Sequence, residues 1–251
     1  MLILTALFLR IFSRALGALW FAPCFGAVEV PKLFRVATAF ALSALIFPVV
    51  FSNAHFEGES LDLARLAGSV SLEFFFGAIL GLSLTVFFNA ARLFGEVVAH
   101  VGGISVAGFF DPSSGEESSA PTRLFFWIAI AVFVLCGGIE SFVDGTLDYY
   151  SVPTPELGDG VRRFAELIGT ALSSSFLLGF KLCAPFIAAT GVAYLALGFA
   201  SRASSSQNLS AAAFNLASLL TLIVLPVALG VFCRVFKVGF VDFLRVVRTF
   251  F

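Results

Sequence analysis

Val70–Phe88 reads VSLEFFFGAILGLSLTVFF, an uninterrupted apolar run long enough to cross a lipid bilayer as one helix. Glu73 is its only ionisable residue, and Gly77 and Gly81 follow it at intervals of four. Residues spaced by four share one face of a helix, and small residues on that face let a second backbone approach closely. We therefore expect this helix to pack against another through Glu73, Gly77 and Gly81. The alternative is that Glu73 titrates as part of a functional site.

Five further runs are comparably apolar, and together they predict an all-α integral membrane protein of about six long helices. They are Leu2–Phe25, Phe34–Phe51, Leu124–Phe142, Leu167–Phe199 and Phe214–Phe232. Hydrophobic residues make up 59% of the 251 residues and charged residues only 12%, so a soluble fold could not cover its apolar surface. The sequence has no evident internal repeat, and we expect a single domain over residues 1–251.

Leu167–Phe199 is longer than one crossing needs, and it carries Lys181 and Pro185 in its middle. An ammonium group in hydrocarbon is costly, and proline removes a helical hydrogen bond and clashes with the preceding turn. We expect this helix either to break there or to lie mostly against protein. A broken helix that carries Lys181 would also suit a second class of protein, a small-solute or ion transporter with its site at the membrane midplane.

Two arginines lie inside the first apolar run. Arg10 and Arg14 share one helix face, which Ser13 and Gly17 extend. A guanidinium that faces lipid costs about 2.5–3.5 kcal/mol on insertion scales, so both arginines should face protein. We expect them to pair with a neighbouring helix in an assembly, and the alternative is contact with a transported substrate.

The stretch Gly103–Pro121 lies between two apolar helices and is poor in helix-forming residues. Its glycines, its Asp-Pro step and its serines favour a flexible loop. The residues that define it are Gly103, Gly108, Phe109, Phe110, Asp111, Pro112, Ser113, Ser114 and Gly115. Two interpretations are open for such a segment: a loop in solvent, or a mobile plug in a passage.

The residues before this loop, Asn89–Val101, are amphipathic at helical spacing. Arg92, Glu96 and His100 recur at every fourth position on the polar face, while the opposite face is apolar. This pattern predicts a helix with one hydrated side.

A second polar connection follows the fifth apolar run. Arg202 precedes a serine-rich stretch that ends in Gln207 and Asn208, and another apolar run follows. Serine, glutamine and asparagine between two apolar helices are typical of a hairpin turn. We expect a polar hairpin at this position.

The sequence contains no recognisable catalytic or cofactor motif, because G-x-S-x-G, H-E-x-x-H and Walker patterns are all absent. The four cysteines form no C-x-x-C pair, and the two histidines, His55 and His100, lie far apart. A net charge of −1 gives no basic surplus for binding nucleic acid. We therefore expect no enzyme activity, no metal or other cofactor, and no nucleic-acid partner.

The order of these motifs resembles that of the FliR/SpaR family, the membrane-associated export-gate subunits of type III protein export in flagella and virulence systems. No single motif carries the resemblance; their order and spacing over most of the chain do. One departure is that the Pro-Gln-x-Asn pattern of the family's last hairpin appears here as Ser206-Gln207-Asn208. The matching positions are Arg10 or Arg14, Pro23, Pro31, Arg35, Glu73, Gly77, Gly81, Gly95, Gly103, Phe110–Pro112, Ser114, Gly115, Gly137, Gly138, Pro153, Pro185, Ala196–Gly198, Ser201, Arg202, Gln207 and Asn208.

The resemblance implies long helical hairpins in a ring-like assembly with FliP- and FliQ-like membrane subunits. It also implies contacts with FlhB- and FlhA-like export proteins, and a place in the bacterial inner membrane at the base of a flagellum or secretion apparatus, with a flagellar role favoured. The loop Gly103–Pro121 would close a central channel for unfolded protein substrates. Packing and assembly would then involve Arg10, Arg14, Glu73, Gly77, Gly81, Lys181, Pro185, Arg202, Gln207 and Asn208.

Overall fold

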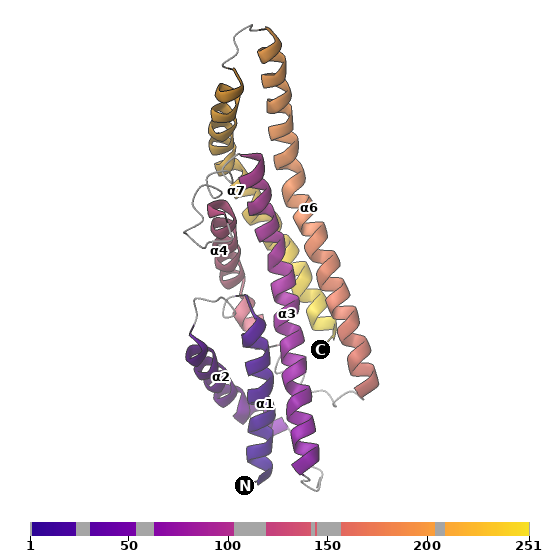
Figure 1. Cartoon of the computed structure of the whole chain (residues 1–251). Helices are drawn as coiled ribbons and strands as arrows, with labels where there is room; N and C mark the ends of the chain where they lie inside the picture. The colour runs from indigo at the N-terminus through magenta and orange to yellow at the C-terminus, as the bar shows by residue number, and fades with distance from the viewer. Residues whose placement is uncertain are drawn as a thin grey trace. The chain divides into compact units, whose positions relative to one another are not determined.

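The computed structural model describes residues 2–23, 31–53, 63–102, 119–141, 144, 157–203 and 209–250. In these residues the regular structure is entirely helical, which confirms the prediction of an all-α membrane protein (Figure 1). The helices are α1 (Leu2–Phe21), α2 (Lys32–Asn53), α3 (Leu63–Val101), α4 (Ala120–Leu135), α6 (Leu157–Ala203) and α7 (Leu209–Phe250). All except α4 are long and apolar enough to cross a membrane.

The boundaries of several helices differ from the sequence prediction: α6 and α7 extend beyond the predicted runs at both ends, and α3 and α4 also differ. Val70–Phe88 and the amphipathic Asn89–Val101 form one continuous α3 of 39 residues, because no helix-breaking residue separates them. In contrast, α4 has only 16 residues, and a positive φ of 73° at Gly137 follows soon after its end. A left-handed glycine just past the last turn is a common helix stop. The described residues therefore contain five helices of spanning length and one shorter apolar helix, in agreement with the expected number of about six apolar helices.

Of the two alternatives for this helix, the break near Pro185 is wrong, because α6 is continuous over 47 residues and includes this proline. Leu182 and Phe186 on either side of it are buried, so packing holds the helix on both flanks of the missing hydrogen bond. Both Lys181 and Pro185 are exposed on the isolated chain.

The contacts divide the chain into two units, and α3, α6 and α7 contribute residues to both. The first unit comprises Met1–Phe87, Gly137–Ser173 and Phe243–Phe251, and the second comprises Phe88–Cys136 and Ser174–Asp242. In the first unit, α1 and α2 form an antiparallel pair. Their contacts pair Ile11 with Ile46 and Val50, and Ala15 and Leu19 with Ala39.

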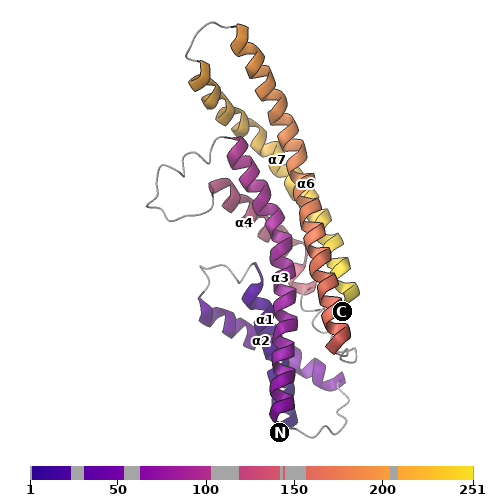
Figure 2. The same ribbon diagram turned by 45° about the vertical axis from the view of Figure 1, so that its right-hand side comes forward.

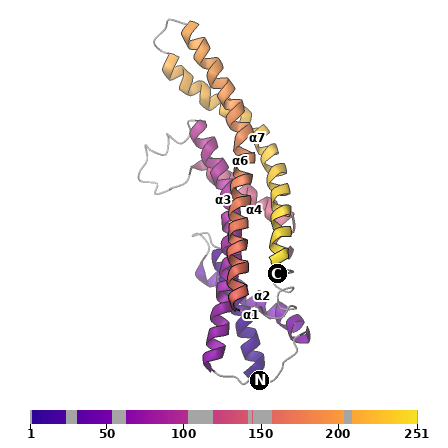
Figure 3. The ribbon, with the colours of Figure 1, turned by 90° about the vertical axis from the view of Figure 1, so that its right-hand side faces the viewer.

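In the second unit, the core is a group of phenylalanine rings from four helices. Phe94 of α3 contacts Phe125 of α4, Phe186 of α6 and Phe232 of α7, with ring centroids 4.7–6.0 Å apart. Edge-to-face and offset pairs at such distances add roughly 0.5–1.5 kcal/mol each beyond burial. Here α6 and α7 run antiparallel, as in a hairpin (Figure 3). Phenylalanine supplies 33 of the 251 residues, and these rings show that part of this content packs helices together.

Large apolar side chains are also exposed along most helices of the isolated chain. Leu33 is 80% exposed, Leu135 85%, and Phe180 and Phe199 71% each. A soluble monomer does not present this much apolar surface to water. Lipid or neighbouring subunits must therefore cover these faces.

Candidate functional site: the α1–α3 contact and the base of the α3–α4 loop

A buried ion pair joins α1 to α3 within the first unit. Arg14 Nη1 lies 3.4 Å from Glu73 Oε2, and the two side chains are only 1% and 7% exposed. A buried charge is costly unless an opposite charge or hydrogen bonds compensate it. The arginine predicted to pair with a neighbouring helix thus finds its partner in its own chain, and Glu73 is engaged in packing.

Further polar contacts fix the register of the same two helices. Arg10 Nε donates to Ser69 Oγ at 3.0 Å, and Ser13 Oγ donates to the Val70 carbonyl at 2.8 Å. The Thr85 hydroxyl donates to the Phe21 carbonyl at the far end of the contact. Because residues later in α1 meet residues later in α3, the two helices run parallel, side by side (Figures 1 and 2).

Glycines on both helices allow their backbones to touch. A Cβ atom added to Gly77 would lie 2.0 Å from the Arg14 carbonyl oxygen, and one added to Gly81 would lie 2.3 Å from that of Ala18. From the other side, a Cβ on Gly17 would lie 2.3 Å from the Phe74 carbonyl oxygen. All three distances are far below van der Waals contact, so no larger residue fits without moving a helix. The stripe of Glu73, Gly77 and Gly81 is therefore the seam on which α1 lies.

The other predicted site residues are not brought to this seam by any described contact. Lys181 and Pro185 lie exposed on α6, and Arg202 belongs to the last turn of α6, with its side chain outside the description. Gln207 and Asn208 lie outside the described residues. The same holds for all the predicted loop residues, Gly103, Gly108, Phe109, Phe110, Asp111, Pro112, Ser113, Ser114 and Gly115.

The two ends of that loop are described, and a chain of hydrogen bonds links them. Thr122 Oγ1 of α4 donates to Glu96 Oε1 of α3 at 2.7 Å, and Ser119 Oγ lies 2.7 Å from the same threonine oxygen. The other oxygen of the Glu96 carboxylate, Oε2, lies 3.8 Å from His100 Nε2. The sequence pattern predicted a polar face at Glu96 but gave no sign of Thr122, because only the fold brings α4 alongside.

Close packing surrounds these hydrogen bonds. A Cβ on Gly95 would lie 2.4 Å from Thr122 Cα, so α3 and α4 are in backbone contact at this point. The Arg92 guanidinium lies 4.3 Å from the centre of the Phe126 ring, a cation–π contact one turn further along. The hydrated face predicted from Arg92, Glu96 and His100 is thus partly covered by α4, although Arg92 and His100 remain exposed.

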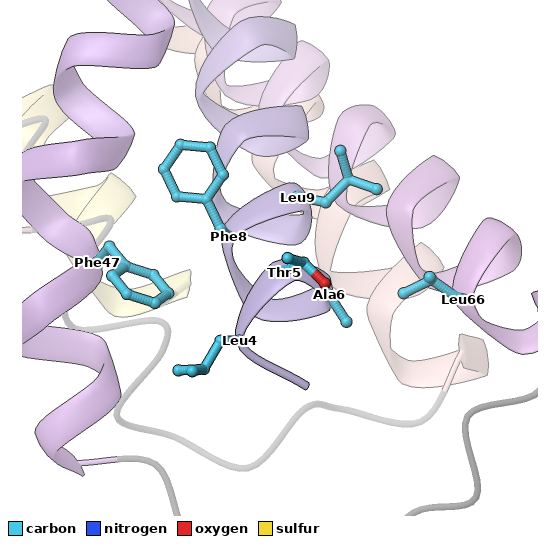
Figure 4. Close-up of a pocket in the computed structure, with 7 residues that line it drawn as sticks. All are labelled: Leu4, Thr5, Ala6, Phe8, Leu9, Phe47 and Leu66. Carbon is cyan, nitrogen blue, oxygen red and sulfur yellow. The ribbon is translucent and has the colours of Figure 1, made fainter. Parts of the chain in front are cut away.

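The structure has an open apolar groove between α1, α2 and α3 in the first unit. It is lined by Leu4, Thr5, Ala6, Phe8, Leu9, Phe47 and Leu66, and Phe8 and Phe47 lie side by side in it (Figure 4). Such a lining offers almost no polar group to orient a solute. Within the described residues, no group of three or more histidine, cysteine or acidic side chains is placed to hold a metal ion.

In the part of the chain that the structure describes, five helices of spanning length, exposed apolar faces and a buried ion pair define a multi-pass helical membrane protein. Residues 5–242 match the family described as "Bacterial export proteins, family 1", and the chain belongs to that family. This match confirms the family resemblance drawn from the sequence.

Individual relatives cover most of the chain. It is 26% identical to the flagellar biosynthetic protein FliR of Bacillus subtilis, over 89% of this chain and 86% of that protein. It is also 26% identical to the FliR protein of Aquifex aeolicus, over 95% and 91% of the two chains. Yop proteins translocation protein T of Yersinia pestis is 22% identical, over 78% of this chain and 74% of its own. The relatives thus include flagellar biosynthetic proteins and a protein named for the translocation of Yop proteins.

Proposed function

We propose that this protein is a subunit of a type III protein export gate, in which it helps to form and close the central channel for unfolded substrates. The observation that carries the proposal is the family match over residues 5–242, with flagellar and translocation proteins among the relatives. The seam between α1 and α3 supports a scaffold role, because the Glu73 carboxylate is buried in an ion pair with Arg14 and is not open to a solute. Catalysis is no part of this role.

The helices expose apolar side chains that other membrane subunits could cover. We propose that these are FliP- and FliQ-like subunits, with FlhB- and FlhA-like export proteins at the same gate. The gate would lie in the bacterial inner membrane at the base of a flagellum, the system to which most of the named relatives belong. Residues 1–251 would act as a single export-gate domain in this assembly.

The transporter hypothesis loses its structural basis. It needed a helix broken at Pro185 to expose backbone groups near Lys181, and α6 is continuous there. In an uninterrupted helix the backbone N–H and C=O groups stay hydrogen-bonded to one another, and only the hydrogen bond that proline cannot donate is lost. The export gate is therefore the one function that we propose.

Deleting Ser113–Ser119 is expected to leave the assembly intact but to make it leak ions and small solutes. The proposed plug is the segment between α3 and α4. The contact of Glu96 with Thr122 lies outside the deletion and is kept, whereas the Ser119 hydroxyl that pairs with Thr122 is removed. Conductance of the purified assembly in planar bilayers, or dye release from vesicles, measures the leak.

A matched control is a deletion of similar length between α2 and α3, at residues 55–61. It should leave both assembly and permeability unchanged, because that connection has no proposed role in closure. Equal permeability of the Ser113–Ser119 deletion and the intact complex, with assembly preserved, would overturn the plug.

A further inference from the structure

The base of the α3–α4 loop is held differently on its two sides. On the α3 side, the Tyr194 hydroxyl of α6 donates to the Val101 carbonyl. A Cβ on the adjacent Gly102 would lie 2.7 Å from a methyl carbon of Thr221 in α7. The end of α3 therefore has contacts with α6 and α7 that do not involve α4.

The start of α4 has a different set of attachments. Ser119 occupies the N-cap position, but its hydroxyl makes no capping hydrogen bond to the α4 backbone. It lies instead 2.7 Å from Thr122 Oγ1. Serine at this position usually accepts from a backbone N–H of the first turn, a contact worth about 1 kcal/mol. Here the Ser119 side chain makes no capping bond and instead bonds to the Thr122 hydroxyl, which in turn bonds to Glu96 of α3.

The direction of this hydrogen-bond chain follows from its acceptor. A carboxylate oxygen only accepts, so the Thr122 hydroxyl donates to Glu96 and is then left to accept from Ser119. Hydrogen bonds in such a row polarise one another, and a charged acceptor strengthens them. Thr122 is only 4% exposed, so water competes poorly for its hydroxyl, whereas the Glu96 side chain is 38% exposed.

We propose that Ser119, Thr122 and Glu96 form a clasp that positions the start of α4 against the last turns of α3, the two helices that segment 103–118 connects. This inference rests on the proposed function, because the clasp would set how tightly the proposed plug is seated. Glu96, Thr122 and Ser119 are then positioning residues of the gate. They would act on closure without contacting the substrate.

The test compares Thr122→Val with Thr122→Ser in the assembled complex. Valine keeps the shape but has no hydroxyl, whereas serine keeps the hydroxyl and loses a methyl group. A matched control is Thr190→Val, because Thr190 is equally buried in the same unit but donates to Phe186 of its own helix. Hydrogen exchange of peptides covering 93–102 and 120–128 reports on the clasp itself, and solute leak reports on closure.

We expect Thr122→Val to speed exchange at the start of α4 by about tenfold, as loss of a hydrogen bond to a charged group implies. Leak should rise with it, and Thr122→Ser should restore both. Exchange and leak equal to those of Thr190→Val would overturn the clasp, as would a serine variant that behaves like valine. A third result separates the clasp from the plug. If Thr122→Val exchanges faster but does not leak, and the Ser113–Ser119 deletion does not leak either, the clasp is supported and the plug is contradicted.

Discussion

Gly77→Ala is expected to separate α1 from α3 and to destabilise the protein strongly. The added methyl carbon would lie 2.0 Å from the Arg14 carbonyl oxygen and 2.9 Å from the Ala18 nitrogen. Both are backbone atoms, so no side-chain rotation relieves the clash. Overpacking of this kind costs about 3 kcal/mol. Unfolding in mixed detergent and SDS micelles, followed by circular dichroism, measures the loss.

The matched control for this substitution is Gly68→Ala, in the same helix. A Cβ on Gly68 meets nothing within 4 Å. Alanine favours the helix by about 1 kcal/mol relative to glycine, so this variant should be as stable as the parent or more stable. If both variants unfolded alike, the seam between α1 and α3 would not be the tight contact described above.

Arg14→Gln is expected to destabilise the protein at least as much as Gly77→Ala. It leaves the Glu73 carboxylate buried without its guanidinium partner, and breaking one side of a buried pair costs about 3–5 kcal/mol. The same micelle titration measures the change. The control is Arg162→Gln, because Arg162 and Glu166 form an ion pair at 3.1 Å on an exposed helix surface. Exposed pairs of this type contribute about 0.3–0.5 kcal/mol, so the control should be close to neutral.

A double substitution separates charge from packing at the same place. Arg14→Met with Glu73→Leu removes both charges while keeping much of the volume, and buried pairs replaced in this way often keep or gain stability. We therefore expect the double variant to recover most of the stability lost in Arg14→Gln. A double variant that unfolds like the single one would show that Arg14 or Glu73 does more than compensate the other's charge.

Periodicity alone predicted the α3 half of the seam. Glu73, Gly77 and Gly81 fall on one helix face, and that spacing is a local property of the chain. It did not identify the partner helix, because pairing α1 with α3 depends on the path of the chain through α2. The ion pair of Arg14 with Glu73 is a long-range contact of this kind.

Helix boundaries were less well predicted. Hydropathy marked an apolar run at Leu124–Phe142, but α4 ends at Leu135, close to the left-handed Gly137. At Pro185 the error was of the opposite kind, because the helix continues where a break was one of the expectations. Local propensity favoured that break, but buried neighbours in α6 hold the helix together. The clasp was not predictable, since it needs Thr122 and Glu96 to meet across an antiparallel pair of helices.

The most direct test of the export-gate assignment is the native mass of the protein purified with its neighbours. A tag on the C-terminus and extraction in mild detergent would keep any membrane assembly together. We predict a large complex that holds one copy of this chain with several copies of two small hydrophobic membrane proteins. A monomer or homodimer without companions, able to move a solute into liposomes on its own, would contradict the assignment.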